Sequence, residues 1–217
     1  MTAFPVLEGE VVRLEPLEPR HAPGLAAAAD ADRASYGYTW VPSGAADALK
    51  YVAEALRERD RGAAVPFAVV LRDGSRVVGT TRFLDLQVFE SSNVRLPEVG
   101  EPPTVAEIGS TWYAGAVQRT PVNTECKLLL LRHAFEVWNV LRVTLKTDAR
   151  NARSRAAIER IGAAFEGIRR VHVPASDGTL RDSAYYSIIR EEWPPIRSRL
   201  MERLSGQRSG HQLTPLH

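Results

Sequence analysis

Apolar and polar residues alternate in several short runs of the chain, and this period of two predicts β-strands. The first run is VVRLEPL at residues 11–17. Two β-rich runs at 66–71 and 76–86 flank Asp73-Gly74, a pair that is typical of a hairpin turn. The remaining strand runs are residues 106–114, 142–148, 164–174 and 181–190.

A second pattern, with apolar residues three and four positions apart, predicts helices between these strands. A short helix is expected after Pro19, and another short one ends the fold at residues 191–204. The longer helices are expected at residues 45–61, 122–138 and 151–163. A loop rich in aromatic residues (36–44) and a long polar loop (90–104) connect them, and loops of that length are often functional.

Strands and helices in this order predict an α/β (α+β) protein. We expect a single mixed, mostly antiparallel sheet of about six to seven strands with helices on both faces. No linker divides the chain, so residues 1–204 are predicted to form one domain. Residues 205–217 (SGQRSGHQLTPLH) are predicted to be a disordered tail.

Composition narrows the functional classes. The 217 residues are 44% hydrophobic and carry a formal net charge of +2, which is too small to argue for a nucleic-acid partner. The single cysteine, Cys126, excludes an internal disulfide. No run of about 20 apolar residues is present, and the first residues lack the pattern of a secretory signal. We therefore expect a soluble, cytoplasmic protein without a membrane partner.

The stretch QRTPVNT at residues 118–124 joins a predicted strand to a predicted helix. The first N–H groups of a helix have no internal partners and the helix dipole favours negative charge there, so such a turn is a candidate anion site. The chain contains neither GxGxxG nor GxxxxGK[ST]. A dinucleotide-binding fold and a nucleotide-hydrolysing P-loop are therefore not expected.

Three motifs in register resemble the GNAT superfamily of acyl-CoA-dependent N-acyltransferases, in particular its RimJ/RimL-type branch. The family's Q/R-x-x-G-x-G/A turn corresponds to residues 118–123, EIGSTWY precedes it, and TDARNARSRAAIERIGAAFEG follows the next strand. The order of elements agrees over roughly residues 8–193. The resemblance implies the GNAT fold and acetyl-CoA, or another acyl-CoA, as co-substrate without a metal.

In the family, backbone N–H groups of this turn hold the pyrophosphate of coenzyme A. Pro121 stands where glycine is usual and has no N–H, although its fixed φ suits the first turn of a helix. The main chain at the end of the preceding strand is expected to part from the next strand, admit the pantetheine arm and polarise the thioester. The residues expected to bind the coenzyme are Tyr113, Ala114, Gln118, Arg119, Thr120, Val122, Asn123, Thr124, Asn151 and Arg153.

Glu107 is the candidate general base, because a glutamate at this spacing removes the amine proton in some members of the family, directly or through water. The alternative is a glutamate that pairs with an arginine or is solvated. Ser154 is the candidate partner of the leaving sulfur, since Ile158 occupies the position where many members have an acidic tyrosine. The alternative for Ser154 is an ordinary first-turn serine, and for Asn151 a plain N-cap. Cys126 is expected to be a small buried side chain, or else a thiol whose pKa is lowered at a helix N-terminus.

The aromatic loop borders the acceptor site in this family, so Tyr36, Tyr38 and Trp40 are expected to contact the acceptor. Arg82 and Arg95 are expected to meet an acceptor carboxylate or phosphate. The alternatives are core aromatic residues and solvated arginines.

The expected activity is transfer of an acyl group, most simply acetyl, to a primary amine of a protein N-terminus or a small molecule by direct attack. The alternative is a non-catalytic acyl-CoA sensor on the same fold, suggested by Pro121 and Ile158. Nucleic-acid binding is not expected. A homodimer is a prediction by analogy with relatives that pair through their last strands.

Overall fold

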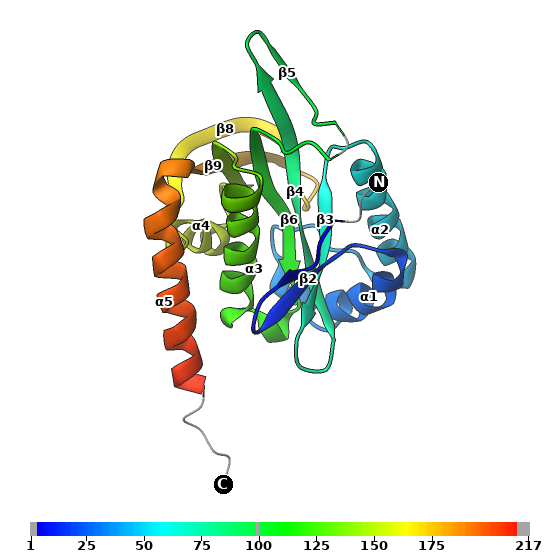
Figure 1. The fold of residues 1–217 in the computed structure, drawn as a ribbon. Helices are drawn as coiled ribbons and strands as arrows, with labels where there is room; N and C mark the ends of the chain where they lie inside the picture. The colour runs from blue at the N-terminus through cyan, green and yellow to red at the C-terminus, as the bar shows by residue number, and fades with distance from the viewer. Residues whose placement is uncertain (1–3, 99, 212–217) are drawn as a thin grey trace.

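The computed structural model describes residues 4–98 and 100–211 (Figure 1). The strands are β1 (Leu7–Glu8), β2 (Val12–Pro16), β3 (Val65–Leu71), β4 (Val77–Glu90), β5 (Asn93–Arg95), β6 (Val105–Tyr113), β7 (Arg142–Asp148), β8 (Ala164–Pro174) and β9 (Leu180–Ile189). The α-helices are α1 (Ala22–Asp30), α2 (Gly44–Asp60), α3 (Pro121–Arg132), α4 (Ala152–Arg160) and α5 (Trp193–His211).

All of these strands join one mixed sheet in the order β1-β2-β3-β4-β6-β7-β9-β8, with β5 paired to β4. Neighbouring strands are antiparallel except for β6 and β7, which are parallel. The predicted mostly antiparallel mixed sheet is therefore confirmed. It has nine strands within the described residues instead of six to seven. The two additions are the short β1 and β5, and β5 lies inside the predicted polar loop.

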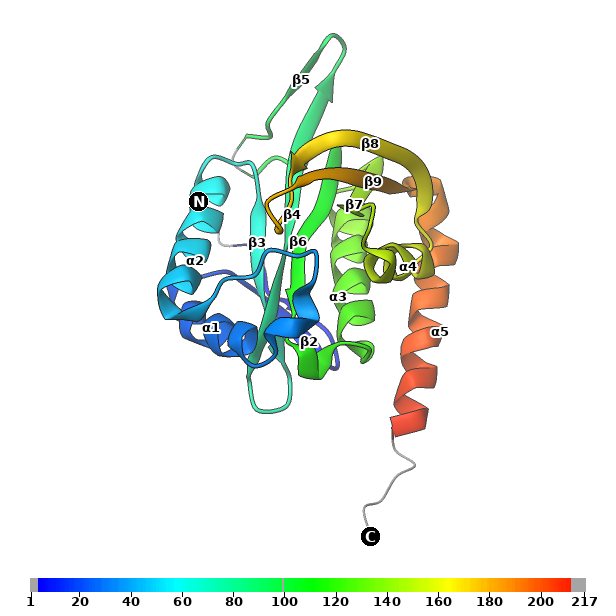
Figure 2. The same cartoon turned by 180° about the vertical axis from the view of Figure 1, so that it is seen from behind.

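Helices cover both faces of the sheet, as two opposite views show (Figures 1 and 2). Successive side chains of a strand point to opposite faces, and β4 illustrates this. Arg82 reaches Glu58 of α2 on one face, whereas Phe83 packs against His133, just after α3, on the other. A continuous core of buried aliphatic and aromatic side chains joins the sheet to the helices on both faces.

Two predicted helices differ in extent from the observed ones. The helix expected at 122–138 begins at Pro121, and its α-helical part ends at Arg132, where a π-helical turn (His133–Val137) takes over. The expected short terminal helix is the 19-residue α5, which continues to His211. The tail predicted to start at residue 205 is thus helical as far as His211, and residues 212–217 lie outside the described part.

The separation of β6 from β7 creates the main cleft. These two strands pair only over three residues each, where Val105–Glu107 of β6 lie beside Arg142–Thr144 of β7. Beyond that point β6 stays with β4 and β7 stays with β9, so the halves of the sheet diverge. A β-bulge near Ser110, whose φ is +46°, further bends β6 away from a regular ladder.

Candidate active site

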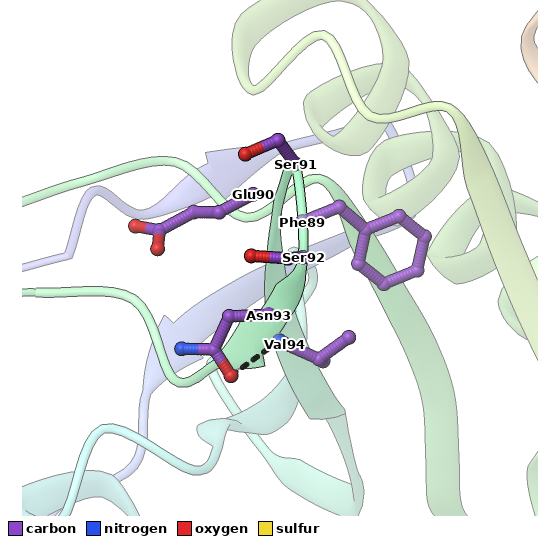
Figure 3. Close-up of a pocket in the computed structure, with 6 residues that line it drawn as sticks. All are labelled: Phe89, Glu90, Ser91, Ser92, Asn93 and Val94. Carbon is purple, nitrogen blue, oxygen red and sulfur yellow. Dashed lines mark hydrogen bonds between the residues drawn. The ribbon is translucent and has the colours of Figure 1, made fainter.

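The cleft has a volume of about 920 Å³ and is bordered by the aromatic loop, β6, β7, the start of α3 and α4. A second hollow lies at the tip of the β4–β5 hairpin, which protrudes from the molecule (Figures 1 and 3). Its titratable side chain, Glu90, is held by Arg95 at 2.7 Å, and Asn93 accepts a hydrogen bond from the N–H of Val94. The hairpin hollow therefore offers no reactive group, and the chemistry is expected in the cleft.

Glu107 lies at the point where β6 and β7 separate, and its side chain lines the cleft although only 2% of the residue is exposed. The carboxylate folds back over Gly109. A Cβ at that position would come within 2.7 Å of Oε1, so a larger residue there would displace the carboxylate from this position. The strand and the glycine together fix the direction of this side chain.

Lys146 of β7 approaches Glu107 from across the cleft, with 2.8 Å between Nζ and Oε2. Nζ is also 3.6 Å from a carboxylate oxygen of Asp85. Burial raises the pKa of Glu107 to about 7, although the ammonium of Lys146 opposes this increase. Burial lowers the pKa of Lys146, but the two carboxylates more than compensate, and the net direction is upward. Near neutral pH, Glu107 can therefore both hold and release a proton.

The turn before α3 has the geometry of an anion site. Thr120 is the N-cap residue: its Oγ1 accepts a long 3.4 Å hydrogen bond from the N–H of Val122 and donates one to the carbonyl of Val117 at 2.7 Å. Pro121 occupies the first helical position, as the sequence predicted. Arg119 has a φ of +63°, the left-handed conformation that a tight turn requires.

The location of the N-cap decides which N–H groups remain free. In a helix capped by Thr120, the N–H of Thr124 makes the first internal bond, to the carbonyl of Thr120. The backbone of Thr124 is thus not a free donor, contrary to the prediction. Val122 is buried and its N–H is already capped. The remaining candidate donors are the N–H groups of Arg119, Thr120 and Asn123, and these three residues line the cleft.

Gln118 connects three parts of the cleft wall. Its amide donates to the carbonyl of Tyr113 at 3.0 Å and to the hydroxyl of Ser35 at 3.2 Å, and it accepts from Arg153 at 3.0 Å. Arg153 also donates to the carbonyl of Ser35. Gln118 and Arg153, both predicted to bind the coenzyme, thus hold together the turn, α4 and Ser35, which directly precedes the aromatic loop.

Ala114 was predicted to polarise the thioester through its backbone, and this prediction is wrong. Its N–H donates to the carbonyl of Val78 at 2.8 Å, so it is already used by β4. N–H groups point to alternate sides along a strand, and that of Tyr113 therefore points towards the side that β7 has left. Tyr113 lines the cleft and stays a candidate contact of the coenzyme.

Asn151 and Ser154 begin α4 on the opposite wall. Asn151 is the N-cap, and its Oδ1 accepts a hydrogen bond from the N–H of Ser154 at 3.0 Å. Both residues line the cleft, and no side-chain partner of the Ser154 hydroxyl is recorded in residues 4–98 and 100–211. The capping role is therefore seen, and contact with the coenzyme remains a prediction for both.

The aromatic loop forms the side of the cleft nearest α1 and α2. Tyr36 is buried, with its hydroxyl bonded to the carbonyl of Ala28 and its ring against Trp112. Tyr38 and Trp40 are 40% and 57% exposed, and Trp40 stacks on Tyr51. All three predicted aromatic residues line the cleft.

The two arginines predicted to bind an acceptor anion are both occupied. Arg82 is buried under Tyr51 and paired with Glu58 at 2.7 Å, outside the cleft lining. Arg95 lies on the protruding hairpin and is paired with Glu90 and Glu101. Each guanidinium already has a carboxylate partner, so binding of an acceptor anion by Arg82 or Arg95 stays a prediction that these ion pairs do not support.

Sequence reasoning missed Lys127 and the role of Lys146. Lys127 of α3 is only 7% exposed, lines the cleft and donates to Thr111 at 3.1 Å. Burial lowers its pKa to about 8. A signal was available, because only three of the 28 basic residues are lysines, and two of them lie here. The neighbouring Cys126 is buried, and burial raises its pKa to about 12, so the alternative of an activated thiol is wrong.

The structure gives two negative findings, both restricted to the residues it describes. Among the side chains described, those of residues 4–98 and 100–206, there is no cluster with the composition of a metal site. None of the helices in residues 4–98 and 100–211 combines the length and apolar character that crossing a bilayer requires.

Comparison with known proteins agrees with this geometry. Residues 12–164 match the family model described as "Acetyltransferase (GNAT) domain". A stretch of 88 residues is 35% identical to the Bacillus subtilis protein named "Putative ribosomal N-acetyltransferase YdaF" and covers 41% of this chain. That stretch spans about half (47%) of the curated relative.

Two solved structures share the fold over nearly the whole chain. A GCN5-related N-acetyltransferase from Brucella melitensis has a TM-score of 0.78 at 28% identity, covering 92% of this chain and 85% of its own. A T. thermophilus protein described as a "putative acetyltransferase" has a TM-score of 0.74 at 34% identity, covering 94% of this chain and 100% of its own.

Proposed function

Because the chain belongs to the GNAT acetyltransferase family, we propose that it transfers an acetyl group from acetyl-CoA to a primary amine. The observation that carries the proposal is Glu107, a buried carboxylate at the divergence of β6 and β7, with its pKa near 7 and Lys146 in contact. An amine attacks a thioester only after losing a proton, and a carboxylate whose pKa is near the working pH accepts that proton efficiently.

The cleft fits a coenzyme that carries a pyrophosphate. Free N–H donors gather at the start of α3, where the helix dipole favours negative charge. Arg119 at the turn, and Arg153 and Arg160 of α4 on the opposite wall, add positive charge around the cleft. We propose that this turn holds the pyrophosphate and that the gap between β6 and β7 admits the pantetheine arm. The bound acetyl-CoA then supplies an acyl group activated as a thioester.

We assign the remaining steps to side chains that line the cleft. Glu107 removes the proton of the bound amine, and Lys146 keeps the carboxylate directed at it. The Tyr113 N–H is directed at the gap, where it can donate to the thioester carbonyl. The hydroxyl of Ser154 is proposed to donate to the sulfur as it leaves. No covalent intermediate on the protein is needed, in keeping with the buried, unreactive Cys126.

The acceptor we propose is the N-terminal amine of a protein. The curated relative is named a ribosomal N-acetyltransferase, and this chain resembles the RimJ/RimL-type branch. The cleft has room for more than the coenzyme arm, because exposed aromatic side chains extend it on the side of Trp40 and Tyr51. A small amine is the alternative acceptor.

The test measures thiol release from acetyl-CoA with a panel of N-terminal peptides and small amines. Glu107→Gln should lower kcat by about 10²–10⁴-fold while the Kd of acetyl-CoA stays unchanged. Glu101→Gln, which removes a carboxylate in the distant loop, is the matched control. Tight coenzyme binding without turnover on any amine would instead support the non-catalytic sensor.

A further inference from the structure

Several cationic side chains of the cleft take part in no ion pair within the described residues, and Arg181 is the one among them that lies on a strand of the sheet. Arg181 of β9 lines the cleft and is half-buried. Its Nε donates to the hydroxyl of Ser183 at 2.8 Å. Across the described side chains of residues 4–98 and 100–206 it takes part in no ion pair, whereas Lys146 on the neighbouring strand is paired with Glu107. Its guanidinium therefore keeps donors available to a ligand.

The nearest acidic residues do not supply the missing charge. Asp148 is engaged by Arg150 through hydrogen bonds of 2.8 and 3.0 Å, and Glu107 by Lys146. Burial lowers the pKa of Arg181, and the charges of Asp148 and Glu107 only partly oppose this. A half-buried cation without a direct counter-ion is destabilised, and an anionic ligand would relieve that cost.

A row of polar side chains connects Arg181 to Glu107 on one face of the sheet. Ser183 is also bonded to Nδ1 of His172 at 2.9 Å, and Nε2 of His172 contacts the hydroxyl of Tyr185 at 3.2 Å. The ring of Tyr185 lies 5.9 Å from Nζ of Lys146, which holds Glu107. The row therefore fixes Arg181 at a defined place relative to the proposed base.

The register of the strands gives the spacing. Tyr185 is opposite Lys146 and Ser183 is opposite Asp148, and Arg181 is the next residue along β9 on the same face. Because Nε of Arg181 is bonded to Ser183, the guanidinium lies back over Ser183, two residues or roughly 7 Å along β9 from Tyr185. An extended peptide advances about 3.3 Å per residue and can reach both the guanidinium and Glu107.

We propose that Arg181 determines acceptor specificity by binding a carboxylate side chain in the second to fourth residue of a peptide whose N-terminal amine meets Glu107. This inference rests on the proposed acetyl transfer. The guanidinium is suited to the task, because its planar array of donors can hold a carboxylate with two parallel hydrogen bonds.

The experiment compares pairs of peptide acceptors that differ only in whether one side chain is a carboxylate or the corresponding amide. Peptides with Asp or Glu at position two, three or four are measured against the same peptides with Asn or Gln, using acetyl-CoA and thiol release. For the wild type we expect kcat/KM to favour the acidic member of at least one pair by about tenfold or more. Arg181→Gln should reduce that ratio to about one, while the Kd of acetyl-CoA and the kcat for the amide peptides stay unchanged.

Arg76→Gln, on the β3–β4 turn, removes the same charge outside the cleft lining and should leave the ratio intact. Equal kcat/KM values within every pair, or a preference that persists in Arg181→Gln, would overturn the inference. So would a free acidic amino acid that reacts as well as the best peptide. In these cases acetyl transfer itself is still observed, whereas failure of the proposed function would appear as no turnover with any acceptor.

Discussion

Glu107, the proposed base, is buried and has a pKa that burial raises to about 7. The carboxylate is almost inaccessible to water, which disfavours its charged form, while the ammonium of Lys146 stabilises that form. The result is a pKa of about 7 in place of the ordinary 4.5. A fully solvated glutamate would be a weaker base, because its lower pKa gives less driving force for taking the proton of an amine.

The pH dependence of the reaction follows from this pKa. The base must be ionised, so kcat/KM for the acceptor should fall as the pH drops through about 7, where half of Glu107 becomes protonated. Glu107→Gln should lose this limb along with most of its activity. The acceptor amine must also lose its proton, and this adds a second limb to the pH profile. A titration of the free acceptor gives its pKa and so identifies that limb. A limb near pH 7 that survives in Glu107→Gln would show that another group is the base.

Lys127 gives a prediction about stability. Burial holds its pKa near 8 in the folded protein, below the value of 10.5 that applies when it is solvated. Between pH 10.5 and about 8 the unfolded protein binds a proton at Lys127 more readily than the folded protein does. The folded state is therefore most stable, with respect to this group, above pH 10.5, and it loses that stability as the pH falls through about 8. Lys127→Met, which removes the charge, should be more stable than the wild type at pH 7 by up to about 3 kcal/mol.

The measurement is urea unfolding of both proteins at pH 7 and near pH 10.5. The stabilisation should disappear at the higher pH, where the folded lysine is neutral. A variant that is less stable than the wild type by the same amount at both pH values would contradict a charge-burial penalty at Lys127.

At the scale of elements, α3 is attached to the N-terminal strands by one buried carboxylate. Glu125 accepts hydrogen bonds from the N–H groups of Glu10, Val11 and Val12 at 3.0, 2.8 and 2.7 Å. These groups form the turn between β1 and β2, and Gly9 leaves the space that the carboxylate fills. The contact fixes α3, and with it the anion-binding turn, against the edge of the sheet.

Glu125→Ala should therefore lower the free energy of unfolding by about 3 kcal/mol or more, since it leaves buried N–H groups without acceptors. Glu125→Gln keeps one carbonyl oxygen and should cost less. Glu202→Ala, on the exposed face of α5, is the control and should change stability by less than about 0.5 kcal/mol. Chemical denaturation measures the free energy of unfolding of all three variants. A Glu125→Ala variant as stable as the wild type would contradict a stabilising role for this carboxylate.

Elements with local signals were predicted well from the sequence. Asp73-Gly74 indicated the β3–β4 hairpin, and Pro121 indicated the start of α3, because both act through the conformation of their own backbone. The end of α3 was not predicted, since the π-turn after Arg132 has no local marker. The length of α5 was underestimated because the glycines and polar residues after 204 suggested a tail. The hydrogen bonds of Glu125 join residues more than 100 positions apart. The periodicity of a sequence reports on local structure and cannot reveal such contacts.

At the scale of the whole molecule, Arg150 connects two sides of the cleft entrance. It is bonded to Asp148, to Asp177 at the tip of the β8–β9 hairpin, and its guanidinium lies 5.0 Å from the ring centroid of Tyr38. Figure 2 shows the aromatic loop passing in front of β6 on the face where this hairpin arches over the sheet. The acceptor is expected to enter between these two segments.

Arg150→Gln should loosen both segments and raise the KM for the acceptor several-fold. The Kd of acetyl-CoA should stay the same, because the coenzyme is expected at the other end of the cleft. Steady-state kinetics at saturating acetyl-CoA separates the two constants, with Arg72→Gln on the far hairpin as the control. A lower kcat with an unchanged KM would contradict this role.

The sequence anticipated one part of the site and missed another. Glu107, the turn at 118–123 and Asn151 could be singled out from the sequence because each lies in a local motif on a strand or at a helix start, and the structure brings them to one cleft. Lys146, Lys127 and Arg181 were not found, because their positions depend on where β6 leaves β7 and on the register of β7 with β9. The acidic partners of Arg82 and Arg95 were not predicted either, because sequence alone does not show which carboxylates fold against a given arginine.

The most direct test of the account is a calorimetric titration of the wild type, Thr120→Asp and Thr120→Ser with acetyl-CoA. Aspartate and serine both cap a helix well, so α3 should form in each variant, and thermal melting checks this. Saturable binding is expected for the wild type and Thr120→Ser, and at least about tenfold weaker binding for Thr120→Asp, whose carboxylate repels the pyrophosphate. Absence of binding to the folded wild type, or equal affinity of Thr120→Asp, would contradict the coenzyme site proposed at the start of α3.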